Sequence, residues 1–280
     1  MRQQGWEFIR MIDQGHPAAE QNHEPNVLST ILPAVLLFFA VVMLWQLVVV
    51  ALKLPPILLP SPVQVARAAI DQAGTLTRGA WVTGTAAVLG FLASVVVGTV
   101  VAALMSQSRL LRLSMYPYVI LLQTVPIVAI APLLVIWSGY EFRTVVLVTL
   151  IISLFPIVNS VTEGLMAIPQ ERVDLFRLYG ASKLQTLWRL RVPTGVRYLM
   201  LGCKTSCGLA VIGAIIAEFF VGNGGANYAG LGTLMTGWQT QSQTAPIMAA
   251  LFVSTWLGIA MFAAVHILSN TILRRWMSNE

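Results

Sequence analysis

The sequence predicts an all-α integral membrane protein with six transmembrane helices. The chain is 57% hydrophobic and only 10% charged, which is less than half the charged share of an ordinary soluble domain. Its apolar residues come in six blocks, each of roughly the 20 residues that a helix needs to cross a bilayer. Because lipid offers no partners to backbone polar groups, these blocks are expected to be helices. The predicted spans lie near residues 31–52, 82–105, 115–137, 144–162, 199–221 and 246–273.

The distribution of Lys and Arg predicts the orientation of the chain. An even number of spans places both termini on one side, and thirteen of the 17 basic residues then fall on that side, with four opposite. The positive-inside rule makes the richer side cytoplasmic. Residues 1–30, which are polar and of mixed charge, are expected to form a cytoplasmic tail before a membrane domain at 31–280. The first span is interpreted as permanent, because no cleavage site follows it. The four outer basic residues are Lys53, Arg67, Arg78 and Arg143.

Two features are predicted for the outer side. Ser61 followed by Pro62 is typical of a helix start, with the serine as N-cap and proline at the first helical position. A short helix along the outer surface is therefore expected near residues 59–73. The uncharged segment Gly222–Gly232 is interpreted as a glycine-rich outer loop.

A charged segment between the fourth and fifth spans is predicted to form a cytoplasmic helix–glycine–helix elbow at residues 171–193. Residues 171–179 carry apolar and charged side chains on different sides of a short helix. Gly180 can close that helix in the left-handed conformation. Ser182 and Gln185 have the spacing of a capping box, so a second helix is expected to start there. Pro193 is expected to end or kink it. The elbow could lie on anionic lipid headgroups or occupy a groove on a cytoplasmic partner.

At this elbow the sequence resembles the permease subunits of binding-protein-dependent ABC importers. Their signature is a Glu-Ala-Ala triplet, a glycine three residues later and a distal Leu-Pro. Here Asp174-Leu175-Phe176 stands at the triplet, Gly180 at the glycine and Val192-Pro193 at the Leu-Pro, so the triplet itself is degenerate. Further stretches are similar to the nitrate, sulfonate and taurine branch, which includes permeases for thiamine-pyrimidine and riboflavin-type precursors. These stretches are LPSP at 59–62, QTVPIVAIAPLLVIWSGY at 123–140, LYGAS at 178–182 and AEFFVG at 217–222.

The resemblance implies a type I ABC importer permease fold in the bacterial inner membrane. The elbow would be a coupling helix that sits in a cleft of an ATPase subunit. Two permease copies, as a homodimer, would enclose one pathway for a small solute, with two ATPases below and a solute-binding protein above. The residues to which the resemblance gives a coupling role are Asp174, Leu175, Phe176, Tyr179, Gly180, Ala181, Ser182 and Pro193.

The sequence lacks the residue patterns that nucleotide binding or metal binding would require. A phosphate-binding loop needs glycines followed by Gly-Lys-Ser/Thr, an order that GASK at 180–183 does not have. We therefore expect no enzyme activity and no cofactor in this chain, with ATP and Mg²⁺ bound by the partner ATPase. Cys203 and Cys207 have no nearby ligand to complete a metal site and are interpreted as packing residues. The net charge of +6 is attributed to membrane topology rather than to nucleic-acid binding.

Polar residues inside the spans are candidates for the translocation pathway, because polar groups in lipid are costly. The alternative for each amide or hydroxyl is a hydrogen bond between helices. Glu218 is expected either to pair with a basic residue of a neighbouring chain or to reach the outer water, in a gating or binding-protein role. The candidate pathway residues are Gln123, Thr124, Ser153, Asn159 and Glu218.

Three rival functions remain at this point. A secondary transporter driven by an ion gradient usually carries ionisable residues at mid-membrane and inverted repeats. Here Glu218 and His266 are the only ionisable residues well inside the predicted spans, and no internal repeat is found. A membrane-embedded enzyme would need a convergent catalytic set, and a channel would need a selectivity filter. Dependence of transport on ATP separates the importer from the carrier and the channel.

Overall fold

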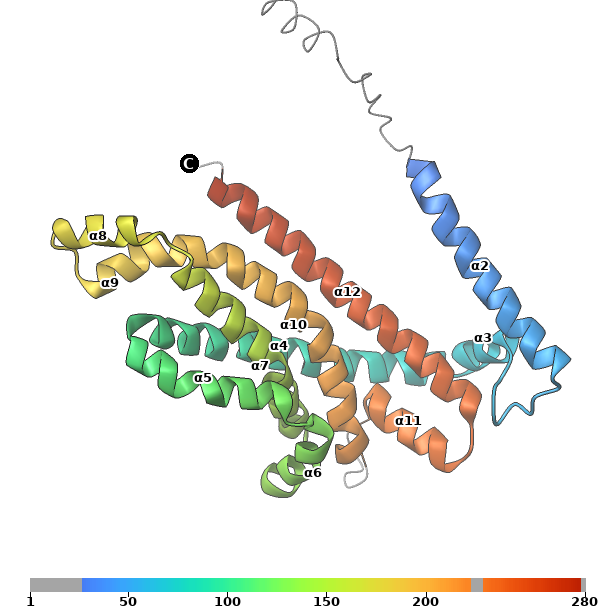
Figure 1. Cartoon of the computed structure of the whole chain (residues 1–280). Coiled ribbons are helices and arrows are strands. Elements are labelled where there is room, and N and C mark those ends of the chain that lie inside the picture. Colours follow the sequence, from blue (N-terminus) through green and yellow to red (C-terminus); the bar gives the residue numbers. More distant parts are fainter. Residues whose placement is uncertain (1–26, 223–228, 278–280) are drawn as a thin grey trace, which may run out of the picture. The chain divides into compact units, whose positions relative to one another are not determined.

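The computed structural model describes residues 27–222 and 229–277, and every regular element in these ranges is helical. The chain divides into two compact units, Met1–Lys53 and Leu54–Glu280. The first contains one described helix, α2 (Val27–Ala51). The second contains the other elements shown in Figure 1. These are α3 (Pro62–Asp71), α4 (Ala73–Gln107), α5 (Arg109–Thr124), α6 (Ile127–Ser138), α7 (Phe142–Met166), α8 (Gln170–Leu178), α9 (Lys183–Thr186), the π-helix η1 (Leu187–Arg191), α10 (Val192–Val221), α11 (Leu231–Thr240) and α12 (Thr244–Met277).

The all-helical membrane fold is confirmed, but six spans are not. Among the described residues, four helices are long and apolar enough to cross a bilayer, or five if one bent pair counts as a span. The predicted spans 82–105, 144–162 and 246–273 lie within α4, α7 and α12. The first predicted span corresponds to the shorter apolar stretch Val35–Ala51 of α2. This helix begins at Val27, inside the segment predicted as tail, while residues 1–26 lie outside the described part.

The predicted third span at 115–137 is not a single straight helix but falls across the bent pair α5 and α6. The chain bends by 99° between α5 and α6. Val125 is extended, with φ −73° and ψ 124°, and Pro126 precedes the first turn of α6. Proline disfavours helical conformation in the residue before it, which explains why the break falls here. Pro132 lies inside α6 without a comparable break.

The short helix predicted near residues 59–73 is present as α3, while its position on the outer side stays a prediction. The Ser61 side chain accepts from the Gln64 backbone N–H at 3.3 Å, and the Gln64 side chain accepts from the Ser61 N–H at 2.8 Å. Pro62 stands at the start of the helix, as expected. The predicted loop at 222–232 is corrected at its end, because α11 already begins at Leu231. Residues 223–228 of that loop lie outside the described residues.

Helices α4, α7 and α10 form the centre of the second unit. All three helices come together around Thr149 of α7, which is fully buried. A Cβ atom on Gly90 of α4 would lie 2.5 Å from Thr149 Cβ, and one on Gly213 of α10 would lie 3.2 Å from Thr149 Cα. Small residues at such points let helix backbones pack closely in membranes. Cys203 and Cys207 of α10 are buried in the adjoining apolar cluster, which agrees with their interpretation as packing residues.

Candidate coupling and translocation site

The elbow folds through the local signals predicted for it. Helix α8 ends at Leu178, and Gly180 follows with φ +71°, where its N–H donates to Arg177 O at 2.9 Å. The Ser182 side chain then accepts from the Gln185 N–H at 3.2 Å, while the Gln185 side chain accepts from the Ser182 N–H at 2.8 Å. The helix–glycine–helix geometry and its capping box are thus present. Figure 1 shows α8 and α9 at one end of the second unit.

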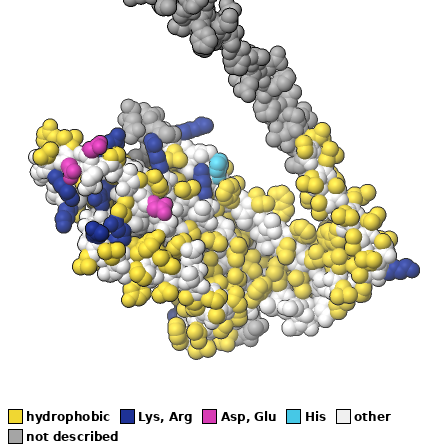
Figure 2. All heavy atoms as spheres, in the orientation of Figure 1, with side chains coloured by type: hydrophobic (Ala, Val, Ile, Leu, Met, Phe, Trp, Pro, Cys, Tyr) yellow, Lys and Arg dark blue, Asp and Glu magenta, His cyan; other side chains and the backbone are white. Residues whose placement is uncertain are grey.

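Large apolar side chains are exposed at the tip of this elbow. Leu178 and Tyr179 are each 84% exposed, and Trp188 is 65% exposed. Val173 is buried and anchors α8 to the body. The only acid–base pair described on α8 joins Arg177 Nη1 to Asp174 Oδ1 at 3.2 Å, and both side chains are exposed. The tip therefore presents an apolar surface with a charged flank. Figure 2 shows Lys, Arg, Asp and Glu side chains gathered at this end of the unit.

Pro193 neither ends nor sharply breaks the second helix of the elbow. The π-helix η1 precedes it, and the Val192 N–H donates to Leu187 O, one residue farther back than in an α-helix. Pro193 then occupies the first turn of α10, where its missing N–H is tolerated. The elbow therefore continues as one helical segment into α10 and the membrane span.

A wide cavity of about 460 Å³ lies beside α5, α7 and α10. It contains Asn159, one of the predicted pathway residues, whose Nδ2 donates to Glu163 Oε1 at 2.8 Å. Glu163 was outside the predicted span, which stopped at residue 162, whereas α7 continues to Met166. The four-residue spacing of Asn159 and Glu163 puts both on one helix face and could have revealed the pair. The other lining residues are Arg112, Tyr116, Thr162, Met166, Ala167 and Tyr198.

The remaining amide and hydroxyl candidates do not join that cavity. Gln123 and Thr124 are exposed at the end of α5, beside the bend, and the Thr124 hydroxyl donates to Leu121 O at 3.2 Å. Ser153 is fully buried between α7 and α10, where its carbonyl accepts from the Ser206 hydroxyl at 2.8 Å. This bond uses the backbone of Ser153, while its own hydroxyl has no hydrogen-bond partner among the described residues, so the side-chain hydrogen bond considered as the alternative is not seen. Its role in the pathway stays a prediction.

Glu218 is fully buried, so the expectation that it reaches the outer water is wrong. Its Oε2 accepts from the Thr83 hydroxyl at 2.9 Å and from the Gly232 N–H at 2.8 Å. The Thr83 hydroxyl oxygen also accepts from the Leu231 N–H at 2.8 Å. Both amides belong to the first turn of α11, where backbone N–H groups have no partner inside the helix. Glu218 of α10 and Thr83 of α4 therefore fix the start of α11.

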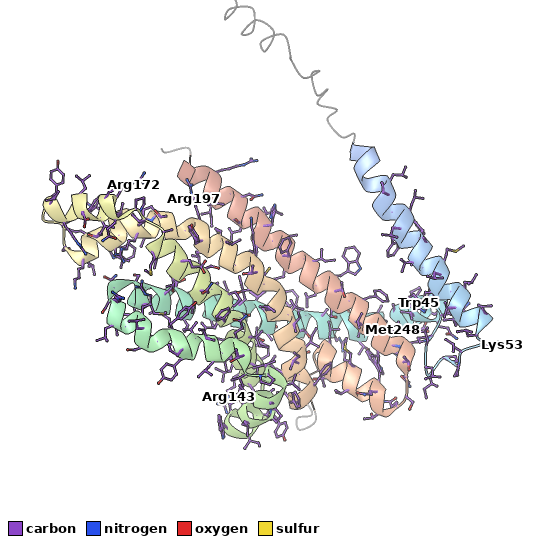
Figure 3. The ribbon with its side chains drawn as sticks, viewed as in Figure 1. Trp45, Lys53, Arg143, Arg172, Arg197 and Met248 are labelled. Carbon is purple, nitrogen blue, oxygen red and sulfur yellow. The ribbon has the colours of Figure 1, made fainter. Side chains whose placement is uncertain are left out.

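The opposite end of the unit carries few charges. Arg143 Nε pairs with Glu141 Oε2 at 2.9 Å at the start of α7. Figure 3 shows Arg143 there, while Arg172 and Arg197 lie toward the elbow end. Arg143, which was predicted to be outer, thus lies near the start of α7, whereas Arg172 and Arg197, which were predicted to be inner, lie toward its other end.

Comparison with known proteins agrees with this arrangement. A family model described as a binding-protein-dependent transport system inner membrane component matches residues 90–278. The chain belongs to this family. It is an ABC importer permease of the nitrate, sulfonate and taurine branch, so the resemblance seen in its sequence motifs is confirmed.

The relatives of this permease differ in their named substrates. The chain is 32% identical over 240 residues to the formylaminopyrimidine transport permease protein ThiX of Halalkalibacterium halodurans, covering 85% of this chain and 93% of that protein. It is 27% identical over 245 residues to the riboflavin transport system permease protein RibX of Chloroflexus aurantiacus, covering 87% and 89%. The putative aliphatic sulfonates transport permease protein SsuC of Bacillus subtilis is 25% identical over 188 residues, covering 67% and 63%.

A solved structure supports the fold. A chain of the methionine ABC transporter MetNI, in an inward-facing form, matches 70% of this permease and 97% of its own length, with a TM-score of 0.56 and 15% identity. At that identity the match concerns the fold alone. It supports a type I importer permease architecture for the matched part of the chain.

Proposed function

We propose that this permease forms the translocation pathway of an ATP-driven importer and couples to its ATPase through the elbow. The observation that carries the proposal is the tip of the elbow. Its backbone is held by Gly180 and a capping box, yet Leu178, Tyr179 and Trp188 remain exposed. Apolar side chains held rigidly in water are typical of a surface that binds a protein partner. Two permease copies, two ATPases and a solute-binding protein complete the proposed assembly.

The inner ends of α5, α7 and α10 form the cytoplasmic part of the proposed pathway. Glu163 is exposed on α7, at the first residue beyond the predicted span 144–162. A carboxylate facing hydrocarbon is costly, so such groups normally face water or a partner. Arg112 and Glu163 give the cavity both signs of charge, and Tyr116 and Tyr198 add aromatic rings. The cavity therefore offers a small solute charged and aromatic groups on a mostly apolar lining.

Two solute classes fit this proposal. One is an anion of the nitrate, sulfonate or taurine type, and the other is a thiamine-pyrimidine or riboflavin-type precursor. The wider coverage and higher identity of the ThiX match favour the second class. Competition of each class for solute uptake by the assembled importer separates them. The alternative, a carrier driven by an ion gradient, would not require an ATPase.

The importer is proposed to lie in the inner membrane with both termini and the elbow in the cytoplasm. The clustering of basic residues at the elbow end supports this orientation. A cysteine placed at exposed Leu178 is expected to react with a membrane-impermeant maleimide only after the cells are permeabilised. Reaction in intact cells would show that the orientation is the opposite of the one proposed.

The coupling role is tested by co-purification with the ATPase subunit. Leu178→Asp and Tyr179→Ser alter exposed side chains, so the permease is expected to fold normally while recovery of the ATPase falls about tenfold. Leu58→Ser, at another exposed leucine of the same unit, is the matched control and is expected to retain the ATPase. Equal recovery with all variants would mean that the elbow lies on lipid headgroups and that docking occurs elsewhere.

A further inference from the structure

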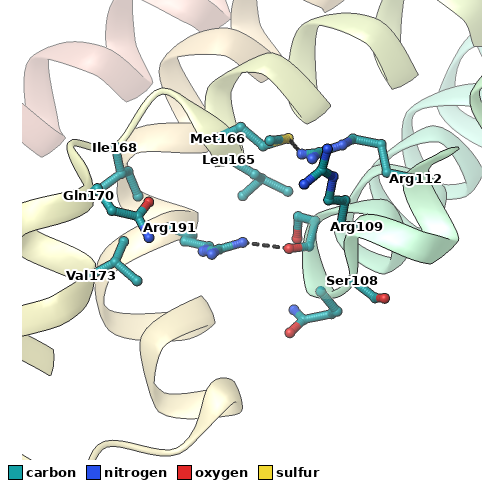
Figure 4. Close-up of a pocket in the computed structure, with 11 residues that line it drawn as sticks. Ser108, Arg109, Arg112, Leu165, Met166, Ile168, Gln170, Val173 and Arg191 are labelled. Carbon is teal, nitrogen blue, oxygen red and sulfur yellow. Dashed lines mark hydrogen bonds between the residues drawn. The ribbon is translucent and has the colours of Figure 1, made fainter. Parts of the chain in front are cut away.

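A second cavity, of about 240 Å³, lies between the α4–α5 turn and the base of the elbow. Three arginines line it, as Figure 4 shows. Arg109 and Arg112 enter from the first turn of α5, and Arg191 enters from η1. No acidic residue is among the described residues that line it. The cavity is therefore a concentration of positive charge formed by segments distant in sequence.

None of the three guanidinium groups has a carboxylate partner among the described residues. Arg112 Nη1 contacts the Met166 sulfur, and a thioether is a weak acceptor. Arg191 Nη1 donates to the Ser106 carbonyl at 2.5 Å. Within the described residues, none of the three forms an ion pair. Three like charges brought together without a counter-ion repel one another, so an anion between them would relieve the repulsion.

The α5 N-terminus adds donors to the same cavity. Ser108 is the N-cap, and its side chain accepts from the Leu110 N–H at 3.2 Å. The other amides of this turn, together with the positive end of the helix dipole, favour an anion. The cavity also contains the Gln170 side chain. Arginine forks and backbone amides match the tetrahedral oxygens of a phosphate group.

We propose that this cavity binds a phosphate group, supplied by an anionic lipid headgroup or by free phosphate. The surface beside it suits a lipid, because Leu110 and Leu113, next to Arg109 and Arg112 in sequence, are 74% and 62% exposed. Acyl chains can lie along these leucines while the phosphate enters the cavity. A bound phosphate joins the α4–α5 turn to the elbow and stiffens the base of the coupling segment. The site adjoins the proposed solute cavity, because Arg112 and Met166 line both, but the proposed phosphate binding does not depend on the transport function.

The test uses the full chain in nanodiscs of equal parts phosphatidylcholine and phosphatidylglycerol. Native mass spectrometry counts the phosphatidylglycerol retained after transfer to detergent. A variant with Arg109→Gln, Arg112→Gln and Arg191→Gln is expected to retain about tenfold less than the wild type, since each charge-assisted hydrogen bond is substantial. Arg189→Gln is the control, because Arg189 is exposed on the same π-helix and does not line the cavity. It is expected to match the wild type.

A second arm identifies the source of the phosphate. This arm uses nanodiscs of phosphatidylcholine alone, with inorganic phosphate added at fixed ionic strength. If free phosphate is the ligand, it is expected to raise the unfolding temperature of the wild type and to leave that of the triple Gln variant unchanged. Phosphatidylglycerol retention without that shift identifies the lipid. The triple Arg→Lys variant keeps the charge but loses the fork geometry, so it is expected to fall between the two. The proposal would be overturned if the triple Gln variant retained as much lipid as the wild type and responded to phosphate in the same way. This holds even if that variant no longer recovered the ATPase.

Discussion

The hydroxyl of Thr83 on α4 donates to Glu218 Oε2 on α10 at 2.9 Å, in a fully buried position. The same Thr83 oxygen accepts from the Leu231 N–H, and the carboxyl group accepts from the Gly232 N–H. Two side chains from separate membrane helices thus cap a third helix. This arrangement gives Glu218 a structural role at the end of the unit opposite the elbow.

Thr83→Val is expected to destabilise the permease by about 2 kcal/mol, because it leaves the Leu231 N–H and one carboxyl lone pair buried without a partner. Thermal unfolding in detergent measures the effect. Thr85→Val on the same helix is the control, since the Thr85 hydroxyl bonds only to Val82 O within α4 among the described contacts. An equal loss in both variants would contradict the capping role.

Gly90→Ala tests the close approach of α4 to α7. The added Cβ would lie 2.5 Å from Thr149 Cβ, so one helix must move. A loss of about 1–3 kcal/mol is expected for this overpacking. Gly208→Ala is the matched control, because nothing lies within 4 Å of its Cβ. There a neutral or slightly stabilising effect is expected in the same unfolding measurement, and a similar loss at both positions would contradict the packing.

The elbow was predictable because its signals are local. Gly180, Ser182 and Gln185 lie within six residues of one another, and each acts on its immediate backbone. The bend at Val125–Pro126 was not predictable, because Pro132 is also a proline within the predicted span and yet lies inside α6 without breaking it. Which of the two prolines breaks a helix depends on packing that a sequence does not display.

Contacts between distant residues were equally hidden. Thr83 and Glu218 are 135 residues apart, so no local sequence pattern predicts that they cap α11 together. Glu163 was missed for a different reason, because it lies one residue past the predicted span 144–162 and only polar residues inside the spans were candidates. Its spacing from Asn159 was the available signal.

Gly180→Val tests the elbow through its backbone. The left-handed conformation of Gly180 costs a residue with a branched Cβ about 1–2 kcal/mol, while the space around it is open. We expect this variant to reduce ATPase stimulation by the permease. Gly180→Asn is expected to keep it, because asparagine tolerates that conformation. Comparable loss with asparagine would show that the turn conformation is not what matters.

Asn159→Ala tests the proposed pathway. It removes the donor that holds Glu163 Oε1, and we expect solute uptake to fall roughly fivefold, the effect of one lost hydrogen bond. Recovery of the ATPase should not change, since the cavity is separate from the elbow tip. Asn270→Ala is the control, because Asn270 lies on α12 and contacts His266 instead. Uptake unchanged in Asn159→Ala would remove this cavity from the pathway.

Uptake into proteoliposomes tests the central claim most directly. The vesicles contain the permease with its ATPase and enclosed ATP, and the binding protein loaded with labelled formylaminopyrimidine is added outside. The importer account predicts uptake that requires ATP and the binding protein and persists when ionophores collapse every ion gradient. Uptake by the permease alone, driven by a proton or sodium gradient and abolished by ionophores, would contradict it and establish a secondary transporter.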